Sequence, residues 1–78
     1  MSYQTVYCVQ PYRRQGRGLE PAGLSSFGLK SEALEVGRLT RPKAAGVLVY
    51  SVEVDTAARI AGRVCVLARH GDVPSISY

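Results

Sequence analysis

The chain has 78 residues and allows a single domain, because a second hydrophobic core would not fit within this length. Its hydrophobic fraction of 46% is typical of a folded protein, and no apolar run reaches the roughly 18 residues of a membrane span. Ten Lys and Arg residues against six Asp and Glu give a net charge of +4, which is modest for a nucleic-acid-binding module. The start of the chain, residues 1–4, lacks the basic and apolar regions of a signal peptide, so we expect a cytoplasmic protein.

The first predicted element is a strand over residues 3–10, which are rich in β-branched and aromatic types. Pro11 has no backbone N–H for a sheet ladder, so we expect the strand to end there. A polar turn that contains two glycines follows over residues 13–18. The next stretch, residues 19–29, has no clear periodicity, and its proline and glycines limit any second strand to a few residues.

A short helix is predicted after this irregular stretch. The Ser31 hydroxyl is a candidate N-cap for its first turn. Apolar and small residues then recur at helical spacing, at Ala33, Val36, Gly37 and Thr40. Pro42 disfavours helical geometry at the residue before it, which predicts a helix end near residue 40 or 41.

Two β-branched runs give the clearest signal in the chain, at residues 47–54 and 63–69. Their separation predicts a hairpin with a loop over residues 55–62. A turn over residues 70–74 closes the predicted domain, which spans residues 1–74. The last four residues, 75–78, are expected to be a frayed C-terminal tail.

The order strand, irregular or short strand, helix, strand, strand predicts an α+β fold. We expect a small, mostly antiparallel sheet of three to four strands, with one helix packed on one face. The position of the first strand stays open. If it pairs with strand 47–54 across the helix, the connection is a right-handed crossover and the two strands are parallel. One face of the sheet would then be left for solvent or a partner.

Ionisable residues do not form a convincing catalytic cluster in the sequence. The single histidine, His70, lies two residues from Asp72, which is typical of a surface turn. Glu53 and Asp55 share a strand face but lie at its solvated end. Two cysteines, at positions 8 and 65, are expected to be small buried residues in a reducing compartment. The sequence therefore predicts a protein that is not an enzyme, with no cofactor and no metal site.

The basic turn at residues 12–18 is the best candidate for a binding site. Its arginines could contact phosphate and its tyrosine could stack on a base, which gives four candidate residues: Tyr12, Arg13, Arg14 and Arg17. The alternative is a solvated hairpin tip whose tyrosine packs into the core. Three arginines are few for a nucleic-acid module, so we expect at most weak, sequence-nonspecific binding.

Three segments of the chain resemble a group of short, uncharacterised bacterial proteins, mostly alphaproteobacterial. They are VQPYRR at residues 9–14, AGVLVYS at residues 45–51 with Asp55, and LARHGDVP at residues 67–74. The resemblance covers most of the chain but implies no activity, because the group has none assigned. With no catalytic motif and an open sheet face, the leading prediction is a binding or assembly module that contacts an unidentified protein partner or a second copy of itself. Weak nucleic-acid binding through the basic turn is the alternative.

Overall fold

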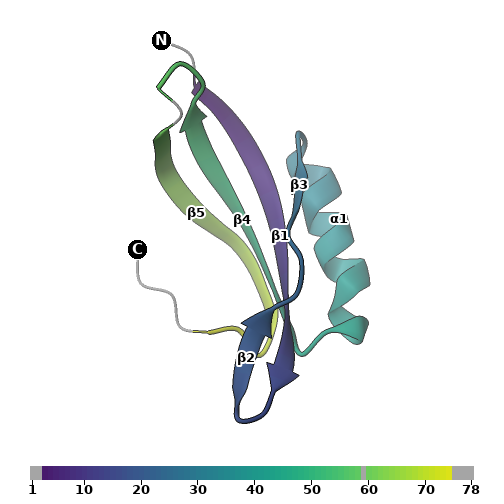
Figure 1. The fold of residues 1–78 in the computed structure, drawn as a ribbon. Helices are drawn as coiled ribbons and strands as arrows, with labels where there is room; N and C mark the ends of the chain where they lie inside the picture. The colour runs from purple at the N-terminus through teal and green to yellow at the C-terminus, as the bar shows by residue number, and fades with distance from the viewer. Residues whose placement is uncertain (1–2, 59, 75–78) are drawn as a thin grey trace.

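The computed structural model describes residues 3–58 and 60–74. Over these residues it has five strands, one α-helix and one short 3-10 helix (Figure 1). In chain order they are β1 (Tyr3–Gln15), β2 (Gly18–Pro21), β3 (Ser25–Phe27), α1 (Lys30–Thr40), η1 (Arg41–Lys43), β4 (Gly46–Asp55) and β5 (Ile60–Gly71). This arrangement confirms the predicted α+β fold, with more strands than the three or four expected. The predicted tail at residues 75–78 lies outside the described residues.

All strand pairs of the sheet are antiparallel. The strand order is β2-β1-β4-β5, and β3 also pairs with β1. The parallel crossover that we allowed for β1 and β4 is therefore wrong. The reason lies in residues 18–27, where β2 and β3 run back along β1 and add one reversal of chain direction. The helix then runs in the direction of β1, and β4 returns antiparallel to it.

We expected the first strand to end at Pro11, but it continues to Gln15. Pro11 faces Val47 of β4 on one side, and its carbonyl accepts a hydrogen bond from the Ala22 N–H at 2.9 Å on the other. The carbonyl and the nitrogen of a strand residue point to the same side. The missing N–H is therefore directed away from β4, into the gap between β2 and β3, and Pro11 removes no bond from the β1–β4 ladder.

The helix covers one face of the sheet and forms the main core with it. Ala33 is fully buried in one cluster with Val9, Val47 and Val49. The helix begins at Lys30 with Leu29 as its N-cap, so the prediction of Ser31 as the cap is wrong by two residues. The Ala33 N–H, at 3.2 Å from the Leu29 carbonyl, closes the first turn without a side-chain cap. Among the described residues, no helix has the length and apolar character needed to cross a bilayer.

Candidate interaction surfaces

The sheet carries a second apolar surface on the side opposite the helix. Successive residues of a strand point to opposite faces, so the neighbours of the core residues on β1 and β4 face away from the helix. The register aligns Val6, Val52 and Val64 in one row across the three long strands, and Cys8, Tyr50 and Val66 in the next. We call this surface the valine face; it consists of Val6, Cys8, Tyr50, Val52, Val54, Val64 and Val66.

The valine face is partly exposed. Val66 is 39% exposed, Cys8 is buried, and the remaining members are half-buried. The ends of the three long strands extend beyond the helix (Figure 1). There the helix-side face is the polar one, with paired Thr5 and Glu53. Beyond the helix, the valines of the three strands therefore lie on the side opposite the helix.

The segment after β5 covers one end of this side of the sheet. A side-chain methyl group on Gly46 would overlap the Asp72 carbonyl oxygen, so the chain after Gly71 crosses directly over Gly46. The Asp72 N–H donates to the Ala45 carbonyl at 2.9 Å and fixes this crossing. Leu48, which faces the same side, is buried. Between the covered end and the valine face, the row of Leu48 also contains Gln10 and the exposed Arg69, so polar side chains border the apolar patch there.

The outer edge of the sheet is the long strand β5. Its pairing with β4 has two register shifts, one between Val49 and Tyr50 and one between Val52 and Val54. Irregularities of this kind twist an edge strand and oppose pairing with another chain. The face of the sheet is therefore a better candidate contact surface than its edge.

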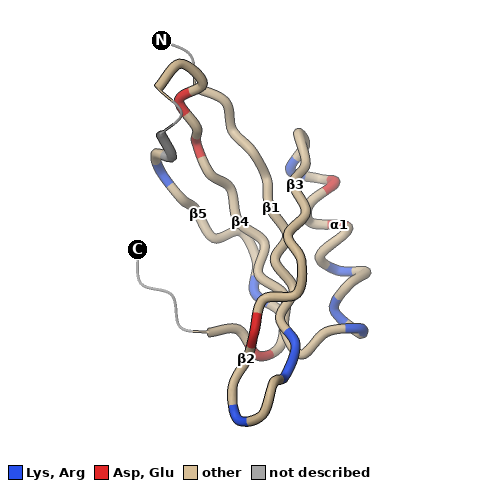
Figure 2. Tube along the Cα trace, in the orientation of Figure 1, with Lys and Arg blue, Asp and Glu red and all other residues tan. Residues whose placement is uncertain are grey.

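The basic hairpin is arranged differently from what the sequence suggested. Arg13 forms an ion pair with Glu20, and Arg14 forms one with Asp72. Figure 2 shows acidic and basic positions side by side around β2. Tyr12 is only 9% exposed, so its ring is not presented to a nucleic-acid base. Among the described residues Arg17, in the two-residue loop between β1 and β2, has no hydrogen-bond or ion-pair partner.

The remaining pairs of reactive residues are not brought together. Asp72 contacts Arg14, while His70 pairs with Val47 in the β4–β5 ladder. Asp55 accepts hydrogen bonds from the N–H groups of Ala57 and Ala58 and so stabilises the loop after β4. No group of three His, Cys, Asp or Glu residues in the described part of the chain could hold a metal ion.

The two cysteines occupy opposite faces of the sheet. Cys8 lies opposite Tyr50 and is buried, whereas Cys65 lies opposite Ser51 and is exposed. The expectation that both are buried is therefore wrong for Cys65. Both are free thiols, and their positions on opposite faces prevent a bridge between them within one chain.

Comparisons with protein-family models, with curated proteins and with solved structures found no match for this chain. The resemblance to a bacterial group stays a prediction, and the functional argument rests on the surfaces described above.

Proposed function

We propose that the protein is a non-enzymatic assembly module of the cytoplasm that associates with a second copy of itself through the valine face. The observation that supports this most directly is the alternation of the three long strands, which places β-branched residues opposite the helix. A small domain of this length has little core, so removing a second apolar surface from water would add to its stability.

The absence of charge on the valine face favours a second copy over a charged partner. None of its seven members is a Lys, Arg, His, Asp or Glu residue, although the chain has a net charge of +4. The seven members themselves bring no like charges together when two copies meet, and Arg69, which pairs with Leu48, lies on the same side at the border of the patch. A two-fold axis makes one apolar patch complementary to itself. A strongly acidic partner would instead be expected to bind a basic surface.

The size of the face sets the expected strength of the contact. A standard interface has about 20 to 30 residues on each side, and the valine face has seven. We therefore expect a weak dimer that forms at micromolar concentrations or above. Sheet-on-sheet packing at a separation of about 10 Å would bury the two valine rows against each other.

Sedimentation of the wild type and two neighbouring variants tests this proposal. Val66→Lys places a charge on the valine face, and Cys65→Lys places the same charge on the opposite face of the same strand. Both positions are exposed, so both variants are expected to fold. We expect the wild type and Cys65→Lys to dimerise with similar affinity, and Val66→Lys to stay a monomer. A wild type that sediments as a monomer up to about 1 mM would contradict the proposal.

Nucleic-acid binding through residues 12–18 has less support. Two of the three arginines are engaged by carboxylates, and the one aromatic ring of the site is buried. The remaining unpaired cation of this turn, Arg17, would supply a single phosphate contact, which gives only weak affinity with a shallow salt dependence.

A further inference from the structure

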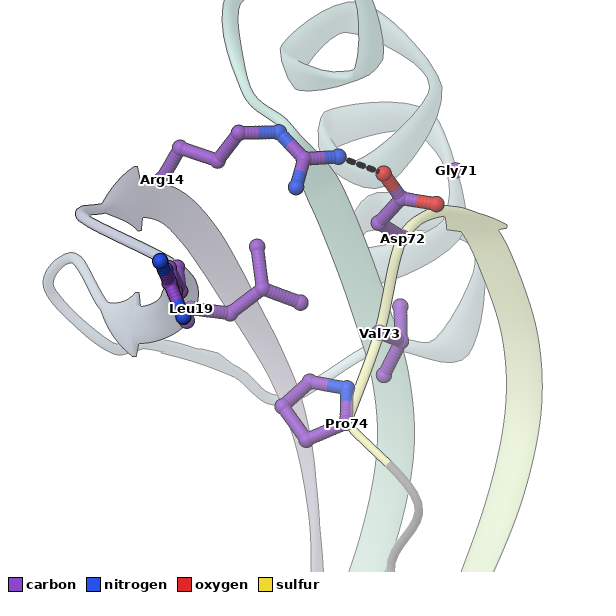
Figure 3. Close-up of a pocket in the computed structure, with 8 residues that line it drawn as sticks. Arg14, Leu19, Gly71, Asp72, Val73 and Pro74 are labelled. Atoms are coloured by element: carbon purple, nitrogen blue, oxygen red, sulfur yellow. Dashed lines mark hydrogen bonds and ion pairs between the residues drawn. The ribbon is translucent and has the colours of Figure 1, made fainter.

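A shallow cavity of about 580 Å³, widely open to solvent, lies between the tip of the β1–β2 hairpin and the segment that follows β5 (Figure 3). This volume is within the range of small-molecule sites in proteins. The side chains that line it are Arg14, Arg17, Leu19, Asp72, Val73 and Pro74. The cavity is thus built from two chain segments that are more than 50 residues apart.

The charged side of the cavity contains two arginines and one carboxylate, so one positive charge has no counter-charge. Arg14 reaches across to the Asp72 carboxylate, and the two charges cancel (Figure 3). Arg17 also lines the cavity, and within the described residues it has no partner. An anionic group is therefore the ligand chemistry that the charged side would attract, since a guanidinium donates to carboxylate and phosphate oxygens.

The other side of the cavity is apolar. The Leu19 side chain points toward Val73 and Pro74 across the space between the hairpin and the C-terminal segment (Figure 3). All three are half-buried, so they present apolar surface to whatever occupies the cavity. A bare inorganic ion would leave this surface uncovered, whereas a ligand with an apolar body would remove it from water.

The backbone at the start of the C-terminal wall is held against β4. Gly71 adopts a φ of +67°, which turns the chain away from β5 and across Gly46. The hydrogen bond from the Asp72 N–H to the Ala45 carbonyl then holds the wall against the start of β4. A fixed wall reduces the ordering cost of binding.

We infer that this cavity binds a small organic anion, with its carboxylate or phosphate group at Arg17 and its apolar body against Leu19, Val73 and Pro74. The inference does not depend on self-association, because the cavity and the valine face share no residue.

An amide NMR titration with matched small probes tests the inference. We would add phenyl phosphate, benzoate, inorganic phosphate and benzyl alcohol in separate experiments. Phenyl phosphate or benzoate is expected to shift the amides of Gly18, Leu19, Asp72 and Val73 with saturation, and the stronger of the two identifies the anionic group. Inorganic phosphate lacks the apolar body and benzyl alcohol lacks the anionic group, so each is expected to bind at least about tenfold more weakly.

Variants on each side of the cavity provide the control. Arg17→Ala should weaken the better probe about tenfold or more, whereas Arg41→Ala, an exposed arginine on η1 away from the cavity, should leave it unchanged. Leu19→Asn should weaken the aromatic probes but not inorganic phosphate. Absence of saturable shifts with either aromatic anion would overturn the inference, as would equal affinities of Arg17→Ala and the wild type. Saturable binding of a single-stranded oligonucleotide alone would overturn it in favour of nucleic-acid binding.

Discussion

Gly46 is the residue at which the fold has least room for a side chain. A methyl group there would overlap the backbone of Asp72, which cannot move without breaking its bond to the Ala45 carbonyl. We expect Gly46→Ala to lower the free energy of unfolding by about 1–3 kcal/mol, the usual range for overpacking. Gly28→Ala is the matched control, because nothing lies within 4 Å of the added methyl. Urea denaturation of both variants measures the difference, and equal losses would contradict the close approach described here.

The ion pair between Glu35 and Arg38 predicts a pH dependence confined to the acid range. Two hydrogen bonds from the Arg38 guanidinium, at 2.6 and 3.2 Å, and its charge hold the pKa of the Glu35 carboxyl below its ordinary value. A lowered pKa in the folded state stabilises the protein above the ordinary pKa, and this contribution is lost as pH falls through the folded pKa. The effect is small, because the pair is exposed.

Carboxyl NMR of Glu35 measures this directly. The pKa should return toward its ordinary value in Arg38→Ala and stay lowered in Arg41→Ala, which leaves the pair intact. A pKa of Glu35 that does not respond to Arg38→Ala would show that the pair does not persist in solution.

For the candidate site residues at 12–18, the sequence predicts their place in the fold but not the residues that they contact. Their positions in a hairpin were predictable, because glycines at 16 and 18 punctuate the turn. Their partners were not. Glu20 and Asp72 lie seven and 58 positions from the arginines that they contact. Tyr12 is buried because the antiparallel register sets it opposite Gly46, a pairing that local composition does not encode.

At the scale of elements, strongly patterned segments were predictable and short ones were not. The run predicted as residues 47–54 is β4 (Gly46–Asp55), and the helix predicted with Ser31 as its N-cap is α1 (Lys30–Thr40). The strands β2 and β3 have four and three residues, too few for a periodic pattern, and they are defined by pairing with β1. Because these two strands were not predicted, the reversal of chain direction that they add was missed. The direction of β4 relative to β1 therefore stayed open.

One side chain adds two hydrogen bonds at the link between β2 and β3, beside the backbone bond from the Ala22 N–H to the Pro11 carbonyl. The Gln10 side-chain amide donates to the carbonyls of Pro11 and Gly23, at 2.9 and 2.8 Å, and so holds the crossing segment against β1. We expect Gln10→Met to lower the free energy of unfolding by about 1 kcal/mol. Gln15→Met, at an exposed position for which the structure gives no side-chain hydrogen bond, should cost less. Hydrogen exchange at the Ala22 amide should also become faster in Gln10→Met, and an unchanged rate would argue against this role.

For the whole molecule, the helix leaves one side of a long sheet without a layer. The described chain has a helix on one side of the sheet and the valine face on the other, and basic residues lie mainly on the hairpin and helix (Figure 2). A domain of this kind can be stable alone, but each valine that stays in water forgoes the free energy of burial. Under the assembly proposal, a second copy would supply the missing layer, and the seven residues of the valine face would add no charge to the contact.

Self-association of this kind couples folding to protein concentration. If unfolding also separates the copies, a tenfold rise in concentration adds about 1.4 kcal/mol per dimer, which raises the melting temperature by about 3 to 5 °C for a domain of this size. The wild type and Cys65→Lys should show this rise over the range in which the dimer forms, and Val66→Lys should show none. A melting temperature independent of concentration in all three proteins would mean that the valine face stays in water under these conditions. The assembly proposal would then have to be replaced by a partner of a different kind.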